Sequence, residues 1–212
     1  MTEASKPGRR PGLRTGRLEA FSDGVFAIAI TLLVLDLSVP PGSGDDLLGT
    51  FFDQWPSYLA YLVSFATIGS AWIGHTVITA FVDRTDSGFA RLNLLLLLVV
   101  SFLPFPTSLV AEYITEEEAV RVAVTILGIN LLLIALVSST LWRHAVRRSL
   151  VRPDTADDEV RLLTQRLTPG LAGYLVLIAL GLFLPLAAVF GYLLIALILI
   201  LPLRRGGSPS PA

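Results

Sequence analysis

Long apolar runs constrain the fold of this chain more than any other feature of its sequence. A helix that crosses a bilayer needs about 20 consecutive, mostly apolar residues. Six runs in the 212 residues fit, at 18–39, 55–81, 92–110, 119–142, 168–184 and 186–203. Only 16% of the residues are charged, against about 25% in a typical soluble domain. The sequence therefore predicts an all-α integral membrane protein with six transmembrane helices.

Proline positions shape the predicted boundaries. Pro104 and Pro106 are expected to kink or end the third span, because proline cannot donate to the helix hydrogen-bond ladder. Residues 168–203 are too long for one helix, so we divide them near Pro185 into two short spans joined by a tight turn. The predicted domains are a basic cytoplasmic leader (1–16), the transmembrane domain (17–203) and a cytoplasmic tail (204–212). The polar segment 147–166 is expected to be a solvated connector, helical in part.

Charge predicts the orientation of the spans, because Lys and Arg accumulate in cytoplasmic segments. Fifteen of the sixteen basic residues lie in the leader, the second loop, the fourth loop or the tail, and the exception is Arg121. The first and third loops otherwise carry only acidic charges. Both termini are therefore expected in the cytoplasm, with the chain in the cell (plasma) membrane. His144 is expected to belong to the basic cytoplasmic rim.

The motif search excludes several function classes. The chain has no cysteine and only two histidines, which lie in different regions. It has no HExxH, GxSxG, Walker or GxGxxG motif, so we predict no enzyme, no cofactor and no resident metal. No basic nucleic-acid-reading motif is present. The TVGYG carbonyl filter of ordinary potassium channels is also absent, and a chain of this kind that conducts ions must select them by another route.

One face of the first apolar run carries four residues at helical spacing. In RLEAFSDGVFAIAITLLVLDL, residues 17–37, this spacing places Ile28, Thr31, Leu32 and Leu35 together. Such a stripe could line a pathway. It is also what ordinary helix packing produces, and periodicity alone leaves both interpretations open.

Polar residues at the start of the same run are harder to explain by packing. Ionisable groups at membrane depth are costly, so they are usually paired and functional. Trp72 and His75, in SAWIGHT, can donate hydrogen bonds to a carboxylate. We therefore predict a polar clamp that ties Arg17, Ser22 and Asp23 to the second span. His75 could equally be a packing histidine.

The stretch beginning at Arg17 resembles the RxxxFSD signature of the TMEM175 family of potassium channels, on Arg17, Phe21, Ser22 and Asp23. The resemblance implies a homotetramer in the lipid bilayer, with six spans per subunit and the first helices around a central pore for K⁺. It implies that Ile28 forms the narrowest ring, that Leu32 and Leu35 form further apolar rings, and that Thr31 supplies a hydroxyl layer.

The resemblance also implies a structural role for the polar residues of the signature. In the family these residues form a network around the pore helix, which carries over to Arg17, Phe21, Ser22, Asp23, Trp72 and His75. The expected function is a leak-type, potassium-permeable channel with a hydrophobic constriction, in which only transient K⁺ in the pore acts as a bound metal. Two alternatives stay open, namely a proton-coupled carrier or membrane-embedded enzyme that uses Asp23 and His75 as a relay, and a non-conducting membrane scaffold.

Overall fold

The structure is an antiparallel helical bundle. The computed structural model describes residues 15–38, 43–167 and 169–201, in which all regular elements are helical apart from one isolated β-bridge. The predicted tail and all but two residues of the predicted leader lie outside these ranges. The α-helices are α1 (Thr15–Leu32), α2 (Leu47–Asp53), α3 (Trp55–Phe81), α4 (Ser87–Phe102), α5 (Pro104–Tyr113), α6 (Ala119–Arg147), α7 (Asp157–Leu167), α8 (Pro169–Gly181) and α9 (Pro185–Ile200), and the 3₁₀ helices are η1 (Leu33–Asp36) and η2 (Ser43–Asp46).

Five stretches among the described residues are long and apolar enough to cross a membrane. They are Thr15–Asp36, Trp55–Phe81, Ser87–Tyr113, Ala119–Arg147 and Asp157–Gly181, and the shorter apolar helix Pro185–Ile200 follows them. The prediction of an all-helical membrane protein is confirmed at this level. The fifth stretch joins the polar helix α7 to the apolar helix α8, so its hydrophobic part is short.

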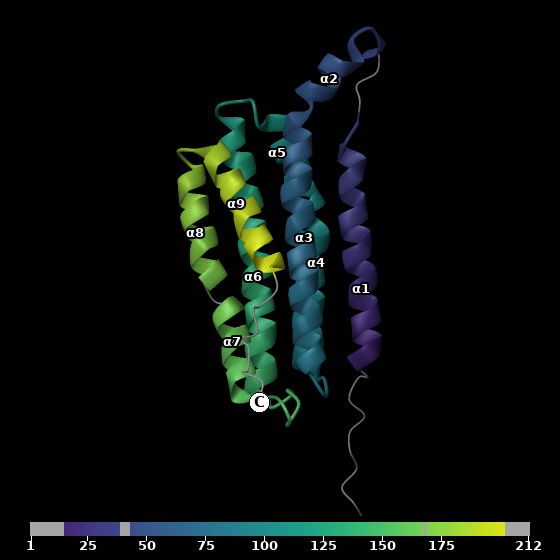
Figure 1. Cartoon of the computed structure of the whole chain (residues 1–212), viewed down its shortest axis with the longest axis vertical. Coiled ribbons are helices and arrows are strands. Elements are labelled where there is room, and N and C mark those ends of the chain that lie inside the picture. The colour runs from purple at the N-terminus through teal and green to yellow at the C-terminus, as the bar shows by residue number, and fades with distance from the viewer. Residues whose placement is uncertain (1–14, 39–42, 168, 202–212) are drawn as a thin grey trace, which may run out of the picture.

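The arrangement places α3 near the middle of the bundle, in contact with α1, α5, α6 and α9. The first helix α1 lies at one edge, where it packs on α3 and α4, and the hairpin of α8 and α9 lies at the opposite edge (Figure 1). The buried residues of α1 are Ser22, Phe26 and Ala29, and Leu33 of η1 continues the same face. One face of α1 therefore joins the core while the opposite face stays exposed in the subunit.

Proline breaks the third apolar stretch into two helices. The helix α4 ends at Phe102, and α5 starts at Pro104, with a proline in its first turn. Proline is tolerated there because the first amide groups of a helix have no intrahelical acceptor. Leu103 between the two helices keeps α-helical backbone angles, with φ of −56° and ψ of −36°, and is fully buried.

The polar connector after α6 is more ordered than the sequence predicted. Its second half forms α7, which packs on α6 with Leu163 buried. The indole Nε1 of Trp142 donates a hydrogen bond to Thr164 Oγ1 at 2.8 Å. This helix is amphipathic, with Asp157, Asp158 and Glu159 in its first turn, so the prediction of a mainly solvated connector is wrong for its apolar face.

Two backbone segments meet at the end of the bundle where α1 begins. Val82 and Val151 form the antiparallel bridge, and hydrogen bonds run from Asp83 N to Leu150 O at 3.0 Å and from Arg152 N to Phe81 O at 2.9 Å. The turn into this bridge uses Ser149 at a φ of 53°. The bridge fixes the loop between α3 and α4 against the segment that leaves α6.

Candidate functional site

The first helix has two chemically different faces. Its outer face exposes apolar side chains, with exposed fractions of 61% for Ile28 and 43% for Leu32, and Leu35 of η1, just beyond the helix, is 72% exposed. Thr31 lies exposed among them. All four predicted pore residues are thus exposed in the single chain, three on the outer face of α1 and Leu35 in η1. Large apolar side chains gathered on one face indicate a surface that lipid or another chain covers.

The hydroxyl of Thr31 is already used by its own helix. Thr31 Oγ1 lies 2.9 Å from both Ala27 O and Ile28 O, to which it donates. Because a hydroxyl has one proton and two lone pairs, the side chain offers acceptor oxygen rather than a donor to whatever lies outside α1. This is the kind of oxygen that replaces water around a cation.

A chain of three buried polar side chains ties α1 to α4 and α3. Asn93 Nδ2 donates to Ser22 Oγ at 2.9 Å, and Asn93 Oδ1 lies 2.7 Å from His75 Nε2. Ser22 Oγ in turn donates to Leu18 O at 2.8 Å. The three side chains are 0–2% exposed. Since Asn93 accepts at Oδ1, the ring of His75 must carry its proton on Nε2.

Asn93 was not among the residues predicted from the sequence. It is the only amide in the run RLNLLLLL, between leucines at 92 and 94. A lone asparagine in an apolar span needs a buried partner, because an unpaired amide is costly in hydrocarbon. That signal was available in the sequence, although it does not say which helix carries the partner.

A second polar contact joins α1 directly to α3, from the residue next to Ser22. The indole Nε1 of Trp72 donates to Asp23 Oδ1 at 2.9 Å. Both side chains are accessible, and together with Phe26, Ile30 and Ile68 they line a groove between the two helices. The single clamp expected from the sequence is therefore divided into two separate contacts, one buried and one at the subunit surface.

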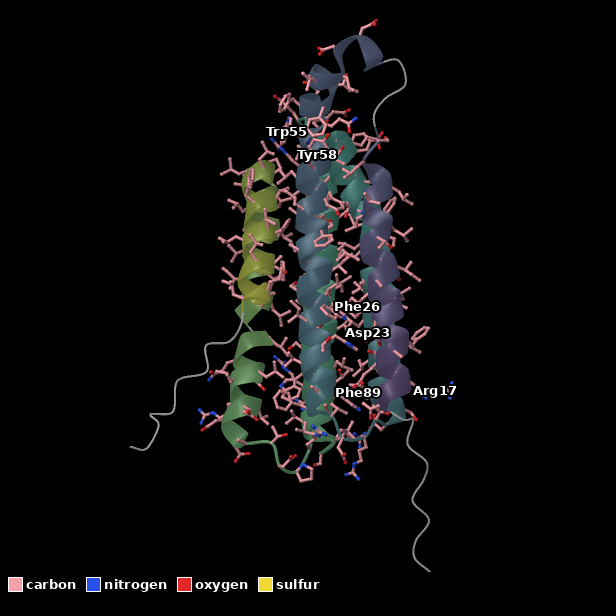
Figure 2. All side chains as sticks on the ribbon, turned by 45° about the vertical axis from the view of Figure 1, so that its right-hand side comes forward. Arg17, Asp23, Phe26, Trp55, Tyr58 and Phe89 are labelled. Atoms are coloured by element: carbon pink, nitrogen blue, oxygen red, sulfur yellow. The ribbon has the colours of Figure 1, made fainter. Side chains whose placement is uncertain are left out.

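Two residues of the signature lie apart from these contacts. Figure 2 shows Arg17 at the lower end of α1 with its side chain directed away from the bundle, whereas Phe26 and Phe89 lie between the helices. Phe21 is 57% exposed and shares the outer face with Ile28, seven residues away. Within one subunit, the polar contacts therefore involve Ser22, Asp23, Trp72 and His75, with Asn93 added.

His144 is part of a specific pair rather than only of a basic rim. Its Nε2 lies 2.9 Å from Asp86 Oδ1, which also caps α4 by accepting from Phe89 N at 2.7 Å. Partial burial favours a higher pKa for Asp86, but these two hydrogen bonds outweigh it and hold the pKa below its usual range, with help from Arg148. The pair fixes the start of α4 to the end of α6.

The polar groups of the site suit anchoring more than chemistry. Across the described residues no three His, Asp or Glu side chains meet as a group that could hold a metal ion. His75 and Asp23 each bond a different partner, Asn93 and Trp72 respectively. The arrangement holds a helix in place and presents its apolar face outward.

Comparison with known proteins shows which family the chain belongs to. The model of the family described as endosomal/lysosomal potassium channel TMEM175 matches residues 17–104. A protein named as a potassium channel from Chamaesiphon minutus is 47% identical over 173 residues, which cover 79% of this chain and 84% of that protein. The chain belongs to the TMEM175 family. The family predicted from the sequence is thereby confirmed.

Other TMEM175 relatives are similar in sequence over half of the chain or more. A protein named as a potassium channel from Streptomyces collinus is 43% identical over 162 residues, covering 76% of this chain and 79% of its own length. The human protein, named as an endosomal/lysosomal proton channel, is 38% identical over 124 residues, which is 52% of this chain but 25% of the human protein. These names describe channels and not enzymes, in agreement with the prediction.

The fold matches a solved TMEM175 structure. The crystal structure of a lysosomal potassium-selective channel TMEM175 homolog from Chamaesiphon minutus superposes with a TM-score of 0.79 at 42% identity, covering 87% of this chain and 95% of that one. A variant of the potassium channel MtTMEM175, crystallised with a nanobody fusion protein, superposes with a TM-score of 0.63 at 21% identity, which supports the shared fold alone.

Proposed function

We propose that the chain forms a homotetrameric, potassium-permeable channel in the plasma membrane, in which four copies of α1 surround the pore. The observation that carries the proposal is the outer face of α1, where Ile28 and Leu32 are 61% and 43% exposed although the helix is anchored by buried polar contacts on its other side. Relatives that match most of the chain are named as potassium channels. A single α1 cannot enclose a pore, so symmetry must supply the others.

The proposed topology has six crossings and two cytoplasmic termini. The start of α1, the loop between α3 and α4, and the end of α6 lie at one end of the bundle, where Val82 pairs with Val151 and Asp86 pairs with His144. Arg84, Arg143 and Arg147 belong to that end. Their accumulation supports a cytoplasmic assignment under the positive-inside rule. α8 and α9 would then make the fifth and sixth crossings.

The proposed pore has an apolar constriction followed by a layer of hydroxyl oxygens. Four Ile28 side chains on a common axis would exclude hydrated ions, and an apolar ring of this kind gates by dewetting. Thr31 lies about one helical turn further along, since α-helices rise about 1.5 Å per residue. Its lone pairs would replace part of the hydration shell of K⁺. Leu32 and Leu35 would keep the wall apolar toward the outer mouth.

In this proposal the polar contacts position the pore helix and do not bind the ion. Ser22 and His75 are bonded through Asn93 on the side of α1 opposite the apolar face, and Asp23 is held by Trp72. Arg17 would be available to a neighbouring subunit. No span carries the regular arginine series of a voltage sensor, which supports a leak-type channel that needs no voltage step.

Flux into vesicles tests the proposal. Wild-type protein should carry potassium in preference to sodium, and Ile28→Asn should give larger and less selective flux, because an amide wets the constriction. Leu175→Asn on α8 is the matched control, since Leu175 is 57% exposed but far from α1 along the fold. Unchanged flux in Ile28→Asn, with inserted and folded protein, would refute the constriction. No flux in any variant would favour the scaffold.

Proton permeation is the second candidate function. The observation that favours it is that the matching vertebrate relatives are named as proton channels. His75 and Asp23 would be the titratable groups of such a path, the same two residues as in the carrier alternative that the sequence left open. A pH-sensitive dye inside the same vesicles distinguishes proton permeation from potassium permeation. Acidification that follows a pH gradient, and that His75→Gln abolishes while potassium flux persists, would support the proton path.

A further inference from the structure

An open apolar groove runs between α4 and α6, away from the pore helix. Its volume is about 380 Å³, and its lining includes Leu98, Phe102, Ile126, Ile129 and Leu133. Its floor is closed by a hydrogen bond from Asn130 Nδ2 to Val99 O at 3.2 Å. The groove is therefore a surface channel along the two helices and does not enter the core. Its apolar lining suits a hydrocarbon chain.

On each of the two helices, the row of exposed residues that lines the groove ends in an arginine at the proposed cytoplasmic side. On α4, Arg91 is exposed and lies seven residues before Leu98, on the same face. On α6, the exposed stripe of Leu133 and Leu136 continues to Arg147. Both arginines therefore lie on the face of the subunit that carries the groove.

The pair of Asp86 and His144 brings the two basic ends together. It joins the residue before α4 to the last turn of α6 at 2.9 Å. Arg91 lies five residues after Asp86, and Arg147 lies three residues after His144. The long arginine side chains extend toward the polar boundary while their stems stay on apolar surface. Because α4 and α6 are antiparallel, Arg91 lies about 7 Å inside the level of this pair and Arg147 about 5 Å outside it. The two side chains can extend toward one headgroup that lies between them.

The depth of these arginines matches the phosphate region of a bilayer. Trp142 of α6 donates to Thr164 of α7, a helix whose first turn holds three acidic residues. Because such a helix belongs in water or among headgroups, the boundary of the hydrocarbon core lies near this level of α6. Leu133, at the near end of the groove, lies nine residues before Trp142, about 14 Å along the helix. Half of the hydrocarbon core is about 15 Å, so an acyl chain from the inner leaflet reaches the groove.

We propose that this groove binds an acyl chain of an anionic phospholipid of the cytoplasmic leaflet, and that Arg91 and Arg147 bind its phosphate. Charge complementarity favours this occupant over a second copy of the chain. A neighbouring subunit has the same orientation in the membrane, so its own basic residues lie at the same level and would repel these arginines. An anionic headgroup satisfies the arginines and its chain covers the groove.

The test measures which lipids stay bound to the purified full-length protein. The protein is equilibrated with vesicles of equal parts phosphatidylglycerol and phosphatidylcholine, extracted in mild detergent, and weighed intact by native mass spectrometry. Wild-type protein should retain phosphatidylglycerol preferentially. Arg91→Gln/Arg147→Gln should reduce that preference by about 25-fold, or roughly fivefold for each arginine near the membrane surface. Arg121→Gln, at the other end of α6, is the matched control and should keep it.

A second pair of variants tests the groove itself. Leu98→Trp should fill the groove and lower the retention of both lipids, whereas Leu175→Trp on α8 should not. Equal retention of the two lipids by wild-type protein would overturn the proposal, and so would full preference in the double arginine variant. Dissociation of the oligomer by Leu98→Trp with unchanged lipid retention would overturn it in favour of a second copy of the chain as the occupant.

Discussion

The most informative substitution is Asn93→Leu, because Asn93 is the centre of the buried polar chain. Its amide donates to Ser22 Oγ at 2.9 Å and lies 2.7 Å from His75 Nε2, and it is 1% exposed. Leucine has the same number and branching of side-chain heavy atoms, so the substitution removes two hydrogen bonds without opening a cavity. It also leaves His75 Nε2 buried without a partner, whereas Ser22 keeps its bond to Leu18 O.

The expected magnitude follows from these contacts. Side-chain hydrogen bonds between membrane helices contribute about 0.6 kcal/mol each on average, and a buried group left without its partner costs about 1–3 kcal/mol. Together they predict a loss of roughly 2–4 kcal/mol in the free energy of unfolding for Asn93→Leu. For a chain of this size, 1 kcal/mol shifts the unfolding temperature by about 2–4 °C, so the shift should be about 5–15 °C.

Asn130→Leu is the matched control. Asn130 is also a buried span asparagine, 4% exposed, but it donates one bond of 3.2 Å to Val99 O and its Oδ1 has no partner in the described residues. Its replacement should cost less than about 1 kcal/mol, since it removes an unpaired acceptor together with one bond. Thermal unfolding in detergent, followed by size-exclusion chromatography of heated samples, compares the two. Equal losses in both variants would refute the reasoning.

A double variant separates the pairing of His75 from its packing. His75→Leu/Asn93→Leu removes both partners, and replacing both members of a buried pair by apolar groups can be nearly neutral. The double variant should therefore be more stable than Asn93→Leu alone. Additive losses would show that the hydrogen bond between His75 and Asn93 contributes nothing of its own.

Two further predictions concern packing and acid stability. Gly128→Ala should lower the free energy of unfolding by about 1–3 kcal/mol, because its Cβ would meet Tyr192 Oη and would lie 2.7 Å from Ile178 Cγ1. Gly74→Ala is the control, since a Cβ there would have nothing within 4 Å. It should be neutral in the same thermal assay. Since the folded pKa of Asp86 is lowered, its contribution is present above the ordinary value of 3.8 and is lost as the pH falls through the folded pKa. Asp86→Asn should therefore flatten the loss of stability below about pH 4 in an acid titration.

Apolar run length predicted the helical fold well because bilayer thickness fixes how long such runs must be. The sequence indicated a helix over residues 55–81, and α3 covers that range. It did not indicate that α7 packs on α6, because eleven residues with three acids in the first turn look solvated until Trp142 and Leu163 are seen on the apolar side. The amphipathic pattern of α7 was detectable in the sequence, but the helix that covers its apolar face was not.

The candidate site was predictable in part. Helical spacing grouped Ile28, Thr31, Leu32 and Leu35, but it cannot distinguish a pore from lipid, and that assignment stays a proposal. The contact between Asp23 and Trp72 is one that donor and acceptor chemistry suggested. Asn93 was missed because a single chain of residues does not show which helices are neighbours, and the partner of Ser22 comes from a helix 71 positions further along the chain.

The most direct test of the pore assignment uses the absence of cysteine from the natural sequence. Ile28→Cys introduces the only thiol of each subunit, and a charged thiol reagent can then be placed at the proposed constriction. Potassium flux into vesicles should stop when the reagent binds, with labelling verified by intact mass, while labelled Leu175→Cys keeps its flux. Undiminished potassium flux through fully labelled Ile28→Cys would contradict the assignment of α1 to the pore.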